Sequence, residues 1–327
     1  MKKILLSVLI IMFCNVIYAQ DVKVSQGRLS IDGLLWLQYI NTFSSISIPE
    51  HPLEDTIFTN SFTRRAAFIG LTANLNNWAS GRIYFDIADI TGKPAYDLYA
   101  LLKPKPNLSF VIGQFKLPLG VEMLTKPENL ELIEYSLIGR DPLRAPKGTR
   151  DIGMQVSYRH SLTDVAIAFV NGNGRNVLKD HDKNKCVAGR FVIKPLQKSN
   201  IFAGVNYYTG NYNMGTVEFS RLGAELNYIV KPIIVKAELL STKDNARTGF
   251  GYYAQVGYNW MWLQPVFRYS TFKYESYDYQ NEIVFGLNFR PLSDNLKIML
   301  NYKIEKTTFV ETKIDTKGLL AQLQFAF

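Results

Sequence analysis

The residues with the clearest capacity for chemistry are cations that gather in and around one long segment, 117–149. Their guanidinium and ammonium groups bind phosphates, carboxylates and other oxyanions through charge-assisted hydrogen bonds. Six cations belong to this group: Lys116, Lys126, Arg140, Arg144, Lys147 and Arg150. Pro142 and Pro146 stiffen the basic stretch because proline fixes the backbone φ angle. The pattern predicts an anion-binding edge on this segment.

The same segment also contains carboxylates that can neutralise those cations. They are Glu122, Glu128, Glu131, Glu134 and Asp141. Two interpretations stay open: the cations face an aqueous channel, or they are ordinary loop residues paired with acids and solvent. Leu130, Ile133 and Leu137 are apolar and can hold the segment against a neighbouring wall, and the pattern predicts a short helix after Pro127.

Motifs for other chemistry are incomplete in this sequence. The acids and amide of 180–184 begin like a calcium loop, but Lys185 stands where that loop needs glycine. The Gly-rich stretch 171–174 precedes no helical pattern, so it does not predict a nucleotide site. His160 and Ser161 are the one close pair of the type that hydrolases use, and they fall at a predicted turn. We expect no catalytic residues, no metal and no cofactor.

The elements that must position the cations are β-strands. In 281–290, Ile283, Phe285 and Leu287 alternate with Glu282, Gly286 and Asn288, and similar alternation recurs along the chain. This period of two predicts strands with one apolar and one polar face. We predict sixteen strands: 29–41, 62–75, 78–88, 95–103, 108–116, 150–160, 164–171, 186–195, 200–209, 219–230, 232–242, 250–260, 262–273, 280–290, 296–306 and 316–327.

The connections between these strands alternate between short and long. Short turns such as 76–77 and 161–163 separate longer loops at 42–61, 89–94, 117–149, 172–185, 210–218, 243–249, 274–279 and 307–315. This rhythm is typical of outer-membrane β-barrels, which have short periplasmic turns and long outer loops. The predicted fold class is therefore all-β: a transmembrane antiparallel β-barrel of about 16 strands, with 117–149 as its third outer loop.

Both ends of the chain fit export to the bacterial outer membrane. Lys2, Lys3 and the apolar run 4–13 predict a signal peptide over 1–20, followed by a short periplasmic segment, 21–28, and a barrel over 29–327. The last strand carries Phe325 and ends at Phe327. It resembles the closing strand of outer-membrane barrels, whose terminal aromatic residue is recognised by the barrel-assembly machinery. We expect both termini in the periplasm and an outer face in contact with outer-membrane lipids.

Composition agrees with this class. The formal net charge of +9 falls to +7 without Lys2 and Lys3, and the cations form no runs, which argues against nucleic-acid binding. Aromatic residues make up 13% of the chain. The mean hydropathy of −0.04 is compatible with a membrane barrel because strand alternation averages apolar and polar faces.

Strand parity adds wall cations to the candidate site. Arg64 and Arg82 are predicted to face the lumen and, with the six cations around 117–149, to set anion selectivity. The other strand cations predicted to face inward are Arg159, Arg190, Lys194, Arg221, Lys236, Arg268 and Arg290. The acids predicted to share that face are Asp32, Asp86, Asp97, Asp151, Glu225, Glu238 and Glu282. Two arrangements stay open. Either the cations line the lumen unpaired, or they form ion pairs with these acids across neighbouring strands.

Three pairs of stretches resemble the phosphate-selective porin O and P family. They are 64–71 with 82–86, 108–119 with 150–155, and 169–174 with 184–190. The resemblance implies a sixteen-stranded barrel, often a homotrimer, whose third outer loop folds into the lumen and narrows the pore. It also implies diffusion of small anionic solutes such as phosphate. The phosphate-binding residues of that family cannot be placed one by one on this sequence.

The expected function is an outer-membrane porin that prefers anions. Two alternatives stay open: a structural or adhesive barrel with a blocked lumen, and a barrel enzyme.

Overall fold

The computed structural model describes residues 22–24, 27–48, 55–89, 91–140, 143–180, 183–196, 200–275, 278–292, 294–310 and 312–327. The predicted signal peptide, 1–20, lies outside these residues. Within the predicted segment 21–28, β1 (Val22–Val24) pairs with the start of β2. The barrel strands are β2 (Gly27–Ser47), β3 (Asp55–Asn74), β4 (Ala79–Asp86), β5 (Ala95–Lys105), β6 (Leu108–Lys116), β7 (Arg150–Arg159), β8 (Thr163–Val170), β9 (Cys186–Ile193), β10 (Asn200–Tyr212), β11 (Val217–Val230), β12 (Ile233–Asp244), β13 (Arg247–Tyr258), β14 (Leu263–Tyr274), β15 (Tyr279–Leu292), β16 (Leu296–Phe309) and β17 (Thr312–Ala326).

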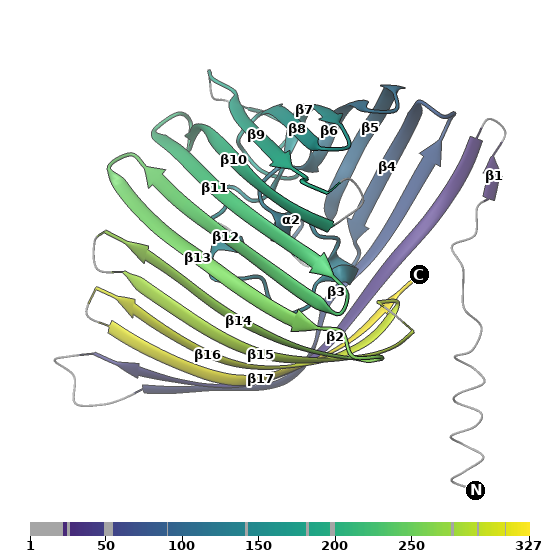
Figure 1. Cartoon of the computed structure of the whole chain (residues 1–327). Helices are drawn as coiled ribbons and strands as arrows, with labels where there is room; N and C mark the ends of the chain where they lie inside the picture. Colours follow the sequence, from purple (N-terminus) through teal and green to yellow (C-terminus); the bar gives the residue numbers. More distant parts are fainter. Residues whose placement is uncertain are drawn as a thin grey trace, which may run out of the picture.

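Strands β2 to β17 form one antiparallel sheet that closes into a barrel (Figure 1). Each strand pairs with the next along the chain, and β17 pairs with β2 from Ala326 opposite Leu34 to Lys313 opposite Ser47. Closure leaves no open lateral edge along these pairings. The prediction of a sixteen-stranded antiparallel barrel is confirmed.

The two faces of the wall differ as the alternation predicted. On β12, Lys236 and Glu238 point to the inner face and are buried, whereas Leu239 points outward and is 46% exposed. Phe267 and Leu287 are likewise exposed on the outward faces of β14 and β15. An apolar exterior around a polar interior is the arrangement that a barrel adopts in lipid.

The strands extend beyond several predicted boundaries. Most of 42–61, predicted as a loop, belongs to β2 and β3, which pair from Ile46–Asp55 inward. In the second half of the chain the predicted loops shrink to tight turns, such as the one between Asp244 and Arg247. The contrast between short and long connections therefore holds mainly in the first half, where 117–149 and 171–185 are long.

A β-bulge changes which side chains of β3 face inward. Between β2 and β3 the register shifts after Trp36, so Leu37 pairs with Arg64 and Arg65 is the inserted residue. Because Leu37 is exposed on the outward face, Arg64 also lies there. The prediction that Arg64 faces the lumen is wrong, since an inserted residue reverses the parity of the strand beyond it. Arg65 turns inward instead, where its Nη1 donates to the carbonyl of Ile133.

The chain ends at the closure between β17 and β2. Phe327 exchanges two backbone hydrogen bonds with Gly33, with N···O distances of 2.9 and 3.0 Å. Its ring covers Gly33, where a Cβ atom would lie 2.3 Å from the ring. Phe325 packs beside it, with ring centroids 6.0 Å apart and the planes tilted by 44°. The terminal aromatic therefore fills the space left by a residue without a side chain at the seam of the barrel.

Segment 117–149 contains three short helical turns: α2 (Val121–Leu124), η1 (Pro127–Asn129) and η2 (Leu137–Gly139). The helix predicted after Pro127 is thus one 3₁₀ turn. Among the described residues, no helix is long and apolar enough to cross a membrane.

Candidate functional site

Apolar side chains hold segment 117–149 against the inner wall. Leu130 packs with Leu34, Trp36 and Phe68, while Ile133 packs with residues of β16 and β17. Leu137 joins a third cluster formed with residues of β12, β13 and β14. All three leucine and isoleucine side chains are buried, and burying each contributes about 1.5–3 kcal/mol. The predicted apolar anchoring is confirmed.

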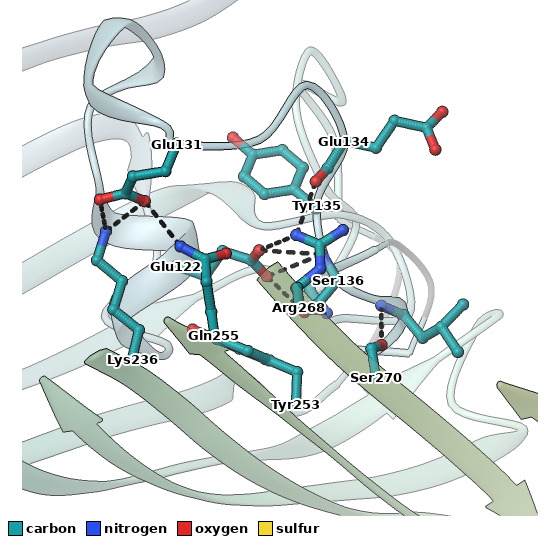
Figure 2. Close-up of polar contacts among 12 residues, drawn as sticks. Glu122, Glu131, Glu134, Tyr135, Ser136, Lys236, Tyr253, Gln255, Arg268 and Ser270 are labelled. Atoms are coloured by element: carbon teal, nitrogen blue, oxygen red, sulfur yellow. Dashed lines mark hydrogen bonds and ion pairs between the residues drawn. The ribbon is translucent and has the colours of Figure 1, made fainter. Parts of the chain in front are cut away.

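The acids of the segment pair with cations of the wall (Figure 2). Glu131 accepts two hydrogen bonds from Lys236 Nζ, at 2.6 and 2.8 Å, and Glu122 accepts one from Arg268 at 3.1 Å. Glu134 pairs with Lys303 at 2.9 Å. Burial raises the pKa of Glu122 above its ordinary value, and the neighbouring Arg268 opposes that rise. The acids that were expected to neutralise the cations of the segment therefore neutralise wall cations as well.

Arg144 is the reverse case, a cation of the segment paired with an acid of the wall. Its Nη2 donates to Glu238 Oε2 at 2.6 Å, and both side chains are 0% exposed. Glu238 also accepts from the backbone N–H of Glu122 and from the hydroxyl of Tyr253. Gly120 permits this approach, since a Cβ there would lie 2.1 Å from Glu238. Arg144 is an anchor, and the prediction that it forms an exposed basic edge is wrong.

Arg140 is intermediate between a buried anchor and an exposed cation. It is part-buried and pairs with Glu282, and it lies 3.5 Å from both Glu134 and Glu305. Three surrounding carboxylates offset its charge, so Arg140 also acts mainly to hold the segment in place.

Backbone groups of the segment are satisfied by wall side chains too. The N–H of Ile133 donates to Asn301 Oδ1 at 2.8 Å, and that of Leu137 donates to Ser270 Oγ at 2.9 Å. Lys297 Nζ donates to the carbonyl of Leu130 at 2.9 Å. Together these contacts bind the segment along its length to the inner faces of β12 to β17.

Open space remains on the other side of the segment. A cavity of about 600 Å³ lies between Leu124–Glu128 and the inner faces of β2 to β7. Two smaller cavities, of about 200 and 110 Å³, adjoin the same part of the segment. Lys116 lines all three. In each of them, cations outnumber carboxylates among the described lining residues.

Four predicted site residues meet at the largest cavity: Arg82, Lys116, Lys126 and Arg150. Arg82 forms a two-point pair with Asp32, with both N···O distances 2.8 Å, and Arg150 pairs with Asp97 at 2.9 Å. Lys126 is largely exposed and lies 3.7 Å from Glu128. An exposed pair of this kind is weak and leaves the ammonium group accessible to solutes.

Lys116 differs from the other three cations. Its Nζ donates to the backbone carbonyl of Met123 at 2.7 Å, and it has no carboxylate partner within the described part of the chain. Arg65, in the neighbouring 200 Å³ cavity, likewise donates to a carbonyl and lies 5.4 Å over the ring of Trp36. Neither cation forms an ion pair with a carboxylate among the described residues, although Glu134 lies near Arg65 and Asp97 and Glu128 line the same cavity as Lys116.

Besides the buried Arg144, two predicted cations lie away from the cavities described above. Lys147 is exposed, donates to Asn213 and lies 5.2 Å over the ring of Tyr212. Arg64 faces outward, as described above. Parity reasoning missed Arg65, and it missed Tyr96, which is inserted at a second bulge and packs on the inner face. The sequence held one clue to Arg65. Adjacent residues of a strand point to opposite faces, so either Arg64 or Arg65 could face inward.

Another cavity, of about 380 Å³, lies between the segment and the ends of β13 to β16 that are farther from the termini. Its two lining cations, Arg140 and Arg247, are paired with Glu282 and Asp278. It offers less uncompensated positive charge than the cavities around Lys116.

Comparisons with solved structures find the same architecture. The outer-membrane channel DcaP of Acinetobacter baumannii matches with a TM-score of 0.69 and 12% identity, covering 93% of this chain and 99% of that one. An anion-selective porin from Comamonas acidovorans matches with a TM-score of 0.66 and 9% identity, covering 91% and 99%. The trimer form of OmpT from Vibrio cholerae matches with a TM-score of 0.58 and 9% identity, covering 91% and 99%.

The sequence itself matches no family model and no curated protein. The resemblance to the phosphate-selective porins is therefore supported for the general fold and not for that family. Each strand pairs with its chain neighbour, the barrel is closed, and solved channel and porin structures match it over more than nine-tenths of the chain. The chain therefore has the sixteen-stranded barrel fold of bacterial outer-membrane porins.

Proposed function

We propose that this protein is a bacterial outer-membrane porin that passes small hydrophilic solutes by diffusion and prefers anions, phosphate and similar oxyanions among them. Barrels of sixteen strands are wide enough to enclose an aqueous channel. The inner face is polar, and the cavities beside segment 117–149 provide the narrow part of the path.

The observation that carries the anion preference is the position of Lys116. It lines three adjoining cavities and has no carboxylate partner among the described residues, whereas Glu122, Glu131 and Glu134 of the segment are engaged with β12 to β16. A cation in a narrow passage attracts anions and repels cations. The similarity to an anion-selective porin agrees with this proposal.

The same proposal includes the surroundings of the barrel. The exposed apolar residues on its outer face suit contact with outer-membrane lipids. We place both termini in the periplasm, because the start of β2 and the end of β17 lie at the barrel end with the shorter turns. A homotrimer is the proposed assembly, since OmpT with the same fold has a trimer form.

The test is the reversal potential of the purified protein in a planar bilayer under a KCl gradient. The wild type is expected to favour chloride. Lys116→Gln is expected to lower the chloride-to-potassium permeability ratio about tenfold, since a unit charge about 6 Å away in water favours the anion and disfavours the cation by about 0.7 kcal/mol each. Lys147→Gln, outside the cavities, is the matched control and should leave the ratio unchanged.

Other outcomes distinguish the alternatives. A folded barrel without conductance would favour a structural or adhesive role with a blocked lumen. Conductance that favours potassium would contradict the anion preference. An equal change in both lysine variants would show that general surface charge, and not the position of Lys116, sets the ratio.

A further inference from the structure

The lining of the 600 Å³ cavity combines charged and apolar side chains. Among its cations are Arg82, Lys116 and Arg150, its carboxylates are Asp32, Asp97 and Glu128, and its apolar side chains include Tyr99, Phe115 and Leu124. A small inorganic oxyanion can use the cations alone. It leaves the apolar side chains in contact with water, which is unfavourable compared with covering them by an apolar group.

Packing with neighbouring residues fixes the rings that line the cavity. Tyr99 packs against the cluster that contains Phe115. Tyr84 lines the cavity and stacks on Phe68, with ring centroids 5.0 Å apart and planes 10° apart. Tyr96 meets Phe68 edge-on at 4.9 Å, and Trp36 does so at 6.1 Å. These rings pack with Leu130 of the anchored segment. A rigid apolar surface binds a flat group at little ordering cost.

The guanidinium groups are fixed against the same rings. Arg82 lies 4.8 Å over Tyr84, and Arg150 lies 4.6 Å over Tyr96. Their carboxylate partners, Asp32 and Asp97, hold them from the wall side. The two guanidinium groups therefore keep fixed positions beside Tyr84 and Tyr96. Lys116 follows Phe115 on β6 and lines the same cavity.

We propose that this cavity selects organic oxyanions that carry a hydrophobic ring, with aromatic carboxylates as the model class, over inorganic oxyanions and short aliphatic acids. The carboxylate meets Lys116 while the ring covers Tyr99, Phe115 and Leu124. A volume of about 600 Å³ lies within the range of pockets that hold small organic ligands. This inference rests on the proposed porin function and names the solutes that its narrow passage favours.

Tyr99 is the residue through which the proposal is best tested. It lines the cavity, is partly exposed, and its side chain forms no hydrogen bond within the described residues. Removing its ring takes away apolar contact without removing a charge. Tyr207, exposed on the outward face of β10, is the matched control.

The experiment measures block of the chloride current by benzoate, acetate and inorganic phosphate added to planar bilayers. In the wild type, benzoate should half-block at a concentration about tenfold lower than acetate or phosphate, because its ring adds apolar burial to the same charge. Tyr99→Ala should reduce that advantage to about threefold or less, and Tyr207→Ala should keep it. If Tyr99→Ala does not fold, Leu124→Ser in the anchored segment replaces it.

Equal half-blocking concentrations for benzoate and acetate in the wild type would overturn the ring preference. An unchanged benzoate advantage in both Tyr99→Ala and Leu124→Ser would overturn its placement at this cavity. Neither result affects the reversal potential under the KCl gradient, which tests the proposed function separately. A barrel that conducts, prefers chloride and treats the probes alike would keep the porin proposal and reject this one.

Discussion

At the residue scale, the cations around 117–149 divide into two groups according to their partners. Arg140 and Arg144 meet wall carboxylates and fasten the segment, whereas Lys116 donates to a backbone carbonyl and forms no ion pair with a carboxylate among the described residues. The sequence predicted which residues are cationic but not which would be paired. The partners of Arg144 and Lys236 lie 94 and 105 residues away, and no local pattern reports such contacts.

The pairing of Glu238 with Arg144 provides a prediction about stability. Glu238→Ala leaves a guanidinium that is 0% exposed without its counterion, and breaking such a buried pair costs about 3–5 kcal/mol. We expect the variant to unfold at lower temperature in detergent and to show a noisier single-channel current as 117–149 loosens. Glu218→Ala, at an exposed position on β11, is the control and should change stability by less than about 0.5 kcal/mol. Equal stability of the two variants would show that the buried pair does not anchor the segment.

At the element scale, period-two alternation predicted the strands well because each face meets a different solvent. All sixteen predicted segments contain a barrel strand, and most wall charges have the predicted side. The wrong side predicted for Arg64 and the omission of Tyr96 from the inner face share one cause. A β-bulge adds one residue to one strand, so parity beyond it reverses, and period-two alternation alone does not locate the inserted residue.

The last strand provides a prediction about barrel assembly. Phe327 closes the seam by two backbone hydrogen bonds and a ring over Gly33, and its recognition by the assembly machinery stays a prediction. Deleting Phe327 should lower the amount of folded barrel in the outer membrane severalfold. Heat-modifiable mobility of outer-membrane fractions measures this, with Phe309→Ala as a control for loss of an exposed aromatic. Normal levels of folded protein after the deletion would refute both roles of the residue.

At the scale of the whole molecule, ion pairs with the wall lie on one side of segment 117–149 and Lys116 lies on the other. Acids of segment 117–149 pair with cations on the inner faces of β12 to β16, and Lys116, which forms no ion pair among the described residues, lies on the side of β2 to β7. In the proposed account, solutes pass between Leu124–Glu128 and the wall of β2 to β7. The account predicts that the segment divides the lumen and that solutes are selected on this side of it.

The most direct test of this account is the single-channel current before and after a bulky thiol reagent is added to two cysteine variants. Leu101→Cys places a thiol at the largest cavity, and Gln255→Cys places one behind Glu131 on the anchored side. The native Cys186 is buried and serves as the unmodified background. The account predicts that modification reduces the current through Leu101→Cys by more than about half and leaves that through Gln255→Cys unchanged. Block of Gln255→Cys with no effect on Leu101→Cys would contradict it.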